Sequence, residues 1–523
     1  MHRIMPVQAP ISVGPKKGLR LGGRGRDMGS KGPEYTNPSI VYQRDRGGHY
    51  NLHNLPILTS ATLGKSFMHH SDKDPIIAVA TAAGRGGIGI LRLSFGKALE
   101  AQIVGRLFGE NCTLKARYAH LLPFLGTDGG VLDRAIVLLF PAPHSYTGES
   151  VLEIQAHGGP VLLSLIMRTC LEKCRDLGLR MAEPGEFTRR AFMNGRMDLT
   201  QAEAVADLID AVSESAVQAA GRSLSGEFSN AVRDVDGNIT ELRAFIEATL
   251  DFPEEDIDVI GSEKVRTRLV QAETGIRAIL ENARQGQVLR EGVTVAIVGS
   301  PNVGKSSLLN ALAQEEVAIV TDIPGTTRDR IEHWVSLNGV PVKMVDTAGI
   351  RTTDDVVESK GIERTLVEIR KADVVLHLKD ASGLIRDDTE VLDKVLKEVR
   401  HGVPLITVNN KVDLCESAAS GGEIAISAKQ GVGLSELKAR LLEVVGMAAT
   451  TDGVFMARER HLQCLKTAAE HVSRALLLID CDPMPELVAE ELRLASRALG
   501  EILGETTTED ILGMIFSKFC IGK

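Results

Sequence analysis

The residues Val293-Thr294-Val295-Ala296-Ile297-Val298 lead without a break into Gly299-Ser300-Pro301-Asn302-Val303-Gly304-Lys305-Ser306, and residues 307–313 have a helical pattern. The first six residues are almost all apolar, which predicts a buried strand. Strand, glycine-rich turn and helix in this order are typical of a phosphate-binding loop. The backbone N–H groups of such a loop surround phosphates at a helix N-terminus. The stretch therefore predicts an α/β nucleotide-binding domain; the alternative, a chance glycine-rich turn, would need neither flanking element.

The loop supplies the first candidate site residues. Lys305 brings positive charge to the β- and γ-phosphates, and the Ser306 hydroxyl is a candidate Mg²⁺ ligand. The other nucleotide contacts expected from the loop are Asn302, Val303, Gly304 and Ser307.

Three downstream motifs indicate which nucleotide binds. Asp346-Thr347-Ala348-Gly349 ends a predicted strand with a carboxylate suited to Mg²⁺ and a glycine near the γ-phosphate. Asn410-Lys411-Val412-Asp413 follows a predicted strand at 405–408, and its last carboxylate can accept both N–H donors of a guanine edge. Adenine would leave that carboxylate unpaired. With Ser427-Ala428-Lys429 completing the base pocket, the order resembles GTPases of the translation-factor class, so GTP is the expected ligand.

The catalytic residues depart from the Ras-like pattern. Ras-like GTPases orient water with a glutamine where this chain has Ile350. Asn302 and Gly325-Thr326-Thr327-Arg328-Asp329 resemble GTPases that bind K⁺ beside the phosphates; for Asn302 the alternative is turn chemistry. The resemblance implies K⁺ ligands at Asn302, Thr321, Ile323 and Thr326, Mg²⁺ at Ser306 and Thr327, and nucleotide contacts from Asp322, Pro324 and Gly325.

Glu358 lies twelve residues after Asp346 in a polar stretch and is the candidate water-orienting carboxylate. The alternative is a solvated surface acid. The expected catalytic set is therefore Glu358, Lys305 and Thr327.

Composition sets limits on the class of protein. The chain has 523 residues, 43% apolar and 25% charged, which is typical of globular proteins and predicts two to four domains. The net charge of −9 argues against an autonomous nucleic-acid binder. Seven scattered cysteines without zinc-pair spacing fit reduced thiols. No apolar run is long enough to span a bilayer, so a cytoplasmic protein without membrane association is expected.

Residues 1–70 are predicted to be a disordered basic extension, because ten cations face three acids up to Phe67 and no helical or strand period is present. An organellar transit peptide is one interpretation. We favour an extension that is dispensable or not translated, with Met68 as the start.

The remaining chain predicts a multidomain α/β and α protein. Strands at 76–80, 89–93, 135–140 and 150–155 with a helix at 160–177 indicate an α+β domain over 71–192, with Cys170 and Cys174 in its core. Residues 193–291 and 449–523 are predicted to form one all-α domain, into which an α/β domain at 292–448 is inserted. The buried faces of its last two long helices are expected to be Leu462, Leu465, Ala469, Val472 and Leu476, and Val488, Leu492, Ala495, Leu499 and Ile502.

Several motifs outside the nucleotide site are informative together. They are Gly84-Arg85-Gly86-Gly87-Ile88-Gly89, Tyr146-Thr147-Gly148-Glu149, His157-Gly158-Gly159-Pro160, Ala182-Glu183-Pro184-Gly185-Glu186-Phe187-Thr188, Gln201-Ala202-Glu203-Ala204, Asp207-Leu208-Ile209-Asp210 and Phe519-Cys520-Ile521-Gly522-Lys523. From about Asp72 to its last residue the chain resembles the MnmE (TrmE) family of tRNA-uridine-modifying GTPases. The α/β insert is then a Ras-like GTPase domain.

The resemblance implies an N-terminal domain that binds a tetrahydrofolate derivative, methylene or formyl, and mediates a homodimer. It also implies an FAD-dependent MnmG-type partner in a heterotetramer. Together the two proteins would place an aminomethyl or carboxymethylaminomethyl group on C5 of the wobble uridine of tRNA. GTP hydrolysis, stimulated when two GTPase domains meet, would gate the reaction.

The resemblance also implies folate contacts at Arg92, Glu153, Arg196 and Lys523. Cationic groups suit a glutamate tail and a carboxylate suits the pterin donors. Arg196 stands where the family pattern has lysine, and strand-end charges are the alternative for Arg92 and Glu153. Cys520 is a candidate folate-proximal thiol, with a buried inert cysteine as the alternative.

Two other functions compete with this hypothesis. A ribosome-assembly or RNA-binding switch GTPase would share the phosphate loop and first switch, but it has no place for the folate-like segment or the C-terminal motif. A regulatory folate sensor with incidental GTP turnover is the third. His144 and His157 are not at metal-ligand spacing, so no metal is assigned to them.

Overall fold

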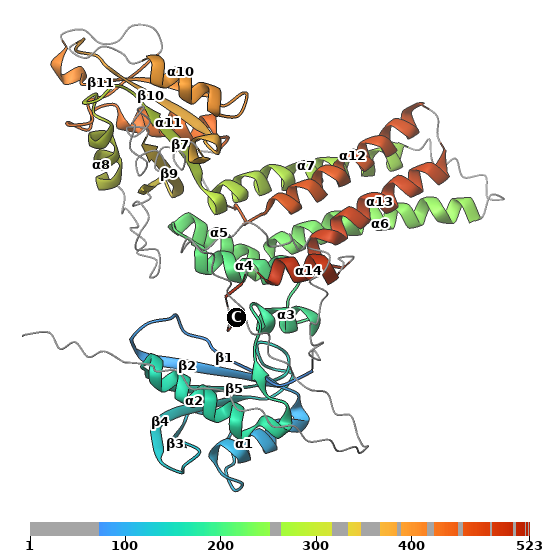
Figure 1. Cartoon of the computed structure of the whole chain (residues 1–523). Coiled ribbons are helices and arrows are strands. Elements are labelled where there is room, and N and C mark those ends of the chain that lie inside the picture. Colours follow the sequence, from blue (N-terminus) through green and yellow to red (C-terminus); the bar gives the residue numbers. More distant parts are fainter. Residues whose placement is uncertain are drawn as a thin grey trace, which may run out of the picture. The chain divides into compact units, whose positions relative to one another are not determined.

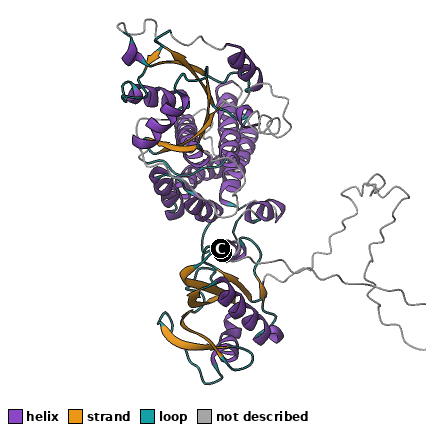
Figure 2. Ribbon diagram, turned by 60° about the vertical axis from the view of Figure 1, so that its left-hand side comes forward, coloured by secondary structure: helices purple, strands orange, loops and turns teal. Residues whose placement is uncertain are grey.

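The computed structural model describes the chain in parts. The described residues are 73–251, 263–315, 333–346, 367–383, 389–415, 423–447, 453–481, 484–505, 509–517, 519, 520 and 522. Figure 1 shows these parts as two sheets and a group of long helices, and Figure 2 shows the strands gathered into the two separate sheets. The basic extension predicted at 1–70 lies outside the described residues.

The first sheet has the order β3-β4-β5-β2-β1-β6. Its strands are β1 (Ile76–Val79), β2 (Gly86–Phe95), β3 (His120–Leu125), β4 (Val131–Phe140), β5 (Ser150–Gly158) and β6 (Arg180–Met181). Helices α1 (Glu100–Phe108) and α2 (Pro160–Lys173) share an apolar core with these strands. The four expected strands are confirmed as β1, β2, β4 and β5. The prediction missed β3, which carries a proline in an edge strand, and the two-residue β6.

Cys170 and Cys174 lie fully buried in this core, as predicted. Burial raises the pKa of Cys174 to about 11 and raises the pKa of Cys170 further, since both thiols are removed from water. Both therefore stay protonated and unreactive at neutral pH.

The helical part follows the first sheet and resumes near the end of the chain. Its elements are α3 (Glu186–Met193), α4 (Leu199–Asp210), α5 (Glu214–Ser225), α6 (Glu227–Asp251), α7 (Glu263–Glu291), α12 (Glu459–Cys481), α13 (Pro485–Leu503) and α14 (Glu509–Phe516). A single apolar core joins α6, α7, α12 and α13, which lie side by side in Figure 1. The predicted face of α13 is buried throughout, whereas on α12 Ala469 and Leu476 are only partly buried.

The second sheet has the order β12-β11-β10-β7-β9-β8. Its strands are β7 (Val293–Val298), β8 (His333–Leu337), β9 (Val340–Asp346), β10 (Val374–Asp380), β11 (Leu405–Asn410) and β12 (Ile424–Ala425). All pairs are parallel except β8 with β9. Helices α8 (Lys305–Glu315) and α11 (Leu434–Val444) contribute to one core of this sheet and α10 (Thr389–Glu398) to another, so its central strands are buried on both faces.

The strand order creates a topological switch point beside β7 in the second sheet. The chain leaves β7 toward β9 on one side, whereas β10 lies on the other side. Ligands of open parallel sheets bind at such a switch point, beyond the carboxyl ends of the strands. The first sheet, the helices and this inserted α/β part together confirm the expected fold class.

The chain passes between the helices and the second sheet twice, once before β7 and once before α12. Ion pairs connect both of these segments to α4. Arg290, two residues before Gly292, donates to Asp207 at 2.9 Å, and Arg458 donates to the same carboxylate at 2.7 Å. Arg460 binds both oxygens of Glu203 at 2.9 and 2.6 Å. We call this group the α4 charge cluster: Glu203, Asp207, Arg290, Arg458, Arg460 and His461.

His461 occupies the cluster as a neutral ring. Its Nδ1 accepts the N–H of Arg458 at 3.1 Å, while Nε2 lies 2.9 Å from Glu203 and donates to it. A proton on Nδ1 would face a backbone donor. Burial, together with nearby Arg460, lowers the pKa of His461 to about 4.

We therefore expect the free energy of unfolding to fall as the pH drops from 6.5 toward 4. The unfolded histidine takes up a proton near 6.5 and the folded one only near 4, so acid favours the unfolded chain by on the order of 3 kcal/mol. Urea unfolding at pH 7, 6, 5 and 4 measures this change in the free energy of unfolding. His461→Gln should flatten the profile in this window; an unchanged profile would contradict the assignment.

Gly286 on α7 is required by a close backbone crossing. A Cβ at this position would lie 1.9 Å from the carbonyl oxygen of Phe455. Gly286→Ala must displace the segment at 455–457 and is expected to cost about 1–3 kcal/mol. Gly237 on α6 has nothing within 4 Å of its Cβ position, so Gly237→Ala should stabilise by about 0.5–1 kcal/mol. Urea unfolding of both variants tests the contrast, and equal effects would refute it.

Candidate functional site

The phosphate loop joins β7 to α8, as the sequence predicts. Asn302 has φ +63°, a conformation that asparagine tolerates better than most residues. Gly304 has φ +105°, and a Cβ there would lie 2.2 Å from Nδ2 of Asn410. Glycine at 304 thus serves both the turn and a close approach between two loops.

Lys305 and the two serines after it begin α8. Lys305 is 8% exposed, and its ammonium donates to the carbonyls of Gly299 and Ser300 at 2.8 and 3.0 Å, so it lies inside the loop. Ser306 and Ser307 are exposed in the first turn. The N-terminus of α8 therefore presents hydroxyls and backbone donors on the side where an anion binds.

Asn410 connects the phosphate loop to the loop at Ala428, which belongs to the predicted base pocket. It is 2% exposed, its Nδ2 donates to the Val303 carbonyl at 2.8 Å, and its Oδ1 accepts the N–H of Ala428 at 3.0 Å. The Asn410 side chain thus connects its own loop to the phosphate loop and to the loop at Ala428. Motifs separated by more than a hundred residues are brought together by it.

Asp413 is an exposed carboxylate in the same region. Its Oδ1 accepts the hydroxyl of Ser427, itself 0% exposed, at 2.6 Å. Lys411 has φ +66°, and Lys429 is exposed beside Ala428. The hydrogen bond from Ser427 orients the Asp413 carboxylate, which can still accept hydrogen bonds from a ligand.

The other predicted residues of the nucleotide site divide into two groups. Asp346 ends β9 opposite Ile297 of β7, which places it beside the phosphate-loop strand. Those outside the described residues are Thr321, Asp322, Ile323, Pro324, Gly325, Thr326, Thr327, Thr347, Ala348, Gly349 and Glu358.

Two predicted folate residues face each other in the first sheet. Arg92 on β2 pairs in register with Glu153 on β5, and its Nε donates to Oε1 at 2.9 Å. The Arg92 guanidinium also lies 5.7 Å from the ring centroid of Tyr146. The Tyr146 hydroxyl lies 2.8 Å from that of Thr188, and burial raises the pKa of Tyr146. Tyr146 was not predicted as a site residue, although its motif was noticed.

Arg196 and the C-terminus lie close to the same region. Gly148 has φ +78°, and a Cβ there would be 3.3 Å from Cγ of Arg196, so the arginine stem lies against the loop that carries Tyr146. The N–H of Gly185 donates to the Cys520 carbonyl at 3.4 Å, and a Cβ at Gly522 would be 2.4 Å from the carbonyl oxygen of Val79.

At the C-terminus, the exposure of Cys520 decides between the two alternatives for this thiol. Cys520 is exposed, so the alternative of a buried cysteine is wrong: the chain turns past Gly185 with this side chain outward. Lys523 lies outside the described residues.

A buried polar network beside Tyr146 was missed by sequence reasoning. Glu186 accepts from Arg180 at 2.7 Å and from Arg190 at 2.8 Å. Although burial opposes ionisation, these bonds lower the pKa of Glu186 to about 2. Arg190 continues to Glu149 at 3.0 Å, which accepts the Ser94 hydroxyl at 2.7 Å. The network fixes the loop at 146–149.

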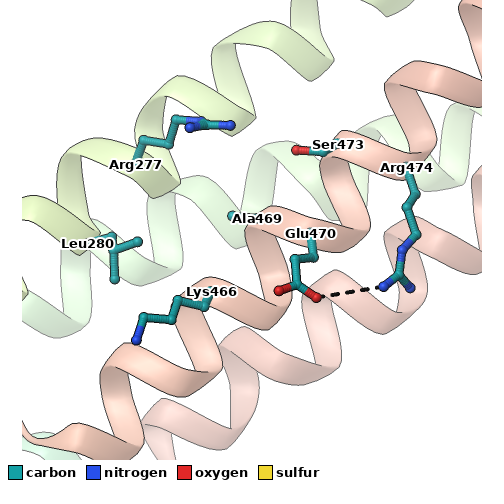
Figure 3. A pocket seen from close by; sticks show the side chains of 7 residues that line it. All are labelled: Arg277, Leu280, Lys466, Ala469, Glu470, Ser473 and Arg474. Carbon is teal, nitrogen blue, oxygen red and sulfur yellow. Dashed lines mark ion pairs between the residues drawn. The ribbon is translucent and has the colours of Figure 1, made fainter. Parts of the chain in front are cut away.

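A groove of about 340 Å³ lies elsewhere, between α7 and α12 (Figure 3). Two of its arginines have acidic neighbours: Arg277 pairs with Glu273 at 2.7 Å, and Arg474 lies 3.6 Å from Glu470. None of the predicted site residues lines it; the lining consists of Arg277, Leu280, Lys466, Ala469, Glu470, Ser473 and Arg474. In the described ranges, no helix combines the length and apolarity that a membrane span requires.

Two family models match the chain: MnmE helical domain over residues 199–520, and GTP-binding protein TrmE N-terminus over residues 75–196. The chain is 50% identical over 467 residues to the tRNA modification GTPase MnmE of Burkholderia cenocepacia (strain HI2424), which covers 87% of this chain and 99% of that protein. The same figures hold for the tRNA modification GTPase MnmE of Paraburkholderia xenovorans (strain LB400).

Solved structures match over smaller parts. A single-residue variant of Aquifex aeolicus Era bound to GDP.AlF4⁻ is 30% identical and covers 34% of this chain and 66% of its own, with a TM-score of 0.24. The FeoB G-domain of Methanococcus jannaschii is 28% identical and covers 29% and 97%, with a TM-score of 0.22.

Proposed function

The chain belongs to the MnmE family of tRNA modification GTPases, and from this we propose that it hydrolyses GTP in the modification of the tRNA wobble uridine. With an FAD-dependent MnmG-type partner it uses a tetrahydrofolate one-carbon unit, methylene or formyl. The product is 5-aminomethyl or 5-carboxymethylaminomethyl uridine. The protein acts in the cytoplasm as a homodimer within a heterotetramer.

The observation that carries the GTP site is the junction at Asn410. Its side chain ties the phosphate loop at Val303 to the base-pocket loop at Ala428. This link supports a single ligand site that spans the proposed phosphate-binding and base-binding groups. Asp413, oriented by Ser427, supplies the acceptor for the donor edge of guanine.

The catalytic ions are proposed from the family pattern. Mg²⁺ would be held by Ser306 and Thr327, and K⁺ by Asn302, Thr321, Ile323 and Thr326. The exposed, left-handed Asn302 supports this proposal, because an exposed side chain in the phosphate loop can face a ligand beside the phosphates. K⁺ supplies positive charge there, and Glu358 is proposed to orient the water.

We propose the division 71–192, 193–291 with 449–523, and an inserted 292–448 for the three domains. Two features support the insertion. Helix α7 ends at Glu291 and β7 begins at Val293, while α12 begins at Glu459 and packs on α7 in the same core.

The proposed folate site consists of Arg92, Glu153, Arg196 and Lys523, with Cys520 as an exposed thiol nearby in the sequence. The closeness of Arg92 to Tyr146 and of Arg196 to Gly148 supports one site, since both contact the loop at 146–149. The guanidinium groups would bind the carboxylates of the folate tail.

We expect Arg92→Gln to weaken 5-formyl-tetrahydrofolate binding about tenfold or more, because a charge-assisted contact is lost. Isothermal titration calorimetry on the full-length protein measures the Kd for 5-formyl-tetrahydrofolate. Arg106→Gln is the matched control, as Arg106 forms an exposed pair with Asp176 on the same domain. GTP hydrolysis should be unchanged in both, and equal folate affinity in the two variants would contradict the site.

Mass spectrometry of nucleosides tests the function. Unmodified tRNA is incubated with the protein, the partner, methylene-tetrahydrofolate, glycine or ammonium, GTP and K⁺. A new C5-substituted uridine that requires wild-type protein and is lost in Lys305→Ala supports the proposal. Its absence, with GTP turnover intact and the partner active with a known homologue, would overturn it in favour of a ribosome-assembly or RNA-binding switch.

A further inference from the structure

Asp380, the last residue of β10, is a buried carboxylate beside the proposed base pocket and is not among the residues proposed to contact the nucleotide. Its side chain is 0% exposed. The strand register places it opposite Asn410, and the N–H of Ala381 donates to the Asn410 carbonyl at 2.9 Å. The carboxylate is therefore next to the loop that carries Lys411 and Asp413.

The two oxygens of Asp380 have different partners. Oδ1 accepts the N–H of Ser382 at 3.0 Å and its hydroxyl at 2.6 Å, which closes the turn after β10. Oδ2 accepts from the Lys411 ammonium at 3.1 Å. Although burial opposes ionisation, these bonds lower the pKa of Asp380, so it is charged at neutral pH.

Lys411 needs such a partner. Its backbone is in the left-handed region, at φ +66°, which costs a lysine free energy that the surrounding contacts must offset. Its side chain is 25% exposed, and a flexible four-carbon stem separates the ammonium from that backbone. Fixing both ends limits the paths that the apolar stem can take beside Asp413.

We propose that Asp380 is a positioning residue for the guanine nucleotide, which holds the Lys411 ammonium so that the lysine stem forms one wall of the base pocket. The stem offers apolar surface to a flat ring while its charge stays paired. The inference rests on the GTP site proposed above. Without the anchor, Lys411 must be ordered by the nucleotide itself, which reduces affinity.

The substitution Asp380→Asn separates the two roles. Asparagine keeps an oxygen for Ser382 and loses the charge that holds Lys411. We expect the KM for GTP and the Kd for GDP to rise about tenfold, the size typical of one charge-assisted hydrogen bond. The kcat at saturating GTP should stay unchanged.

The matched control is Ser382→Ala, which weakens the turn and leaves the Asp380–Lys411 pair in place. It should change the KM less than about twofold, because the charge-assisted bond to Lys411 is retained. A double-mutant cycle completes the test on the full-length protein: Asp380→Asn should add nothing in a Lys411→Met background, because its effect runs through that ammonium.

Three results would overturn the inference: an unchanged KM in Asp380→Asn, an equal rise in Ser382→Ala, or a full additional rise in the Lys411→Met background. Failure of the proposed GTP site can be distinguished from failure of the Asp380 inference. If Asp413→Asn leaves the base preference unchanged, the proposed GTP site itself is wrong; if only the Asp380 variants fail, the site stands.

Discussion

Replacing Asp413 with asparagine is expected to convert the protein from a GTPase into an enzyme that prefers XTP. In the proposed site the carboxylate accepts hydrogen bonds from the ring N–H and the exocyclic amino group of guanine, whereas asparagine presents a donor that opposes that amino group. Xanthine carries a carbonyl at the same carbon and accepts that donor. The Ser427 hydroxyl, 2.6 Å from Oδ1, can donate equally to the asparagine carbonyl, so the loop should keep its conformation.

The expected effect is large because two hydrogen-bond donors, the asparagine amide and the guanine amino group, would face each other in the bound complex and leave each other unpaired. We expect the KM for GTP to rise by at least about a hundredfold and the KM for XTP to approach that of the wild type for GTP. Steady-state phosphate release with GTP and with XTP measures the two KM values. Lys305→Ala, which removes the phosphate contact common to both, should hydrolyse neither.

A loss of GTP turnover without a gain with XTP would point to an unfolded pocket instead of altered recognition. Far-UV circular dichroism and the KM for XTP distinguish the two. Retention of a wild-type GTP:XTP preference would remove Asp413 from the base-binding set and with it the proposed guanine pocket.

The strands, the helix and the loops that carry the proposed nucleotide site could be predicted because their signals are local. The predicted strand at 293–298 is observed as β7, and the helix expected over 307–313 lies within α8. Each tetrapeptide motif follows a strand, and the carboxyl ends of parallel strands meet at one edge of a sheet. Spacing along the chain therefore predicted which loops gather, before any distance was known.

The contacts between distant segments could not be predicted in the same way. Glu203 was noticed within Gln201-Ala202-Glu203-Ala204, but its partners Arg460 and His461 lie more than 250 residues later, beyond the inserted sheet. No periodicity relates α4 to the start of α12. Similarly, nothing local in the sequence shows that Gly286 meets the carbonyl of Phe455, because that requirement arises only when two remote backbones cross.

Removing the carboxylate of Glu203 is expected to be the most destabilising change in the helical part of the chain. Glu203 is 2% exposed and accepts from Arg460 at 2.9 and 2.6 Å and from His461 at 2.9 Å. Although burial alone would raise it, the pKa of Glu203 is held well below its usual range by the hydrogen bond from His461 and by the Arg460 guanidinium. Its charge is thus present in the folded protein at neutral pH.

Glu203→Ala leaves Arg460 without its anionic partner and takes away the acceptor for Nε2–H of His461. Deleting one member of a buried pair usually costs about 3–5 kcal/mol, because the remaining charge is desolvated without compensation. Glu203→Gln preserves the shape and an acceptor but removes the charge. It should cost less than Glu203→Ala and still far more than a surface change.

Urea unfolding of the full-length protein, followed by far-UV circular dichroism, tests this expectation. Glu490→Ala is the matched control, since Glu490 pairs with Arg493 on the outer face of α13 and both side chains are about half exposed. Exposed pairs contribute little, so its midpoint should not move. Equal midpoints for Glu203→Ala and Glu490→Ala would show that the ion pairs of Glu203 do not stabilise the contact between α4 and the segment at 458–461. A selective loss in Glu203→Ala would establish Glu203 as the residue that anchors this segment to α4, whereas Asp207 pairs with the arginines on both sides of the insertion.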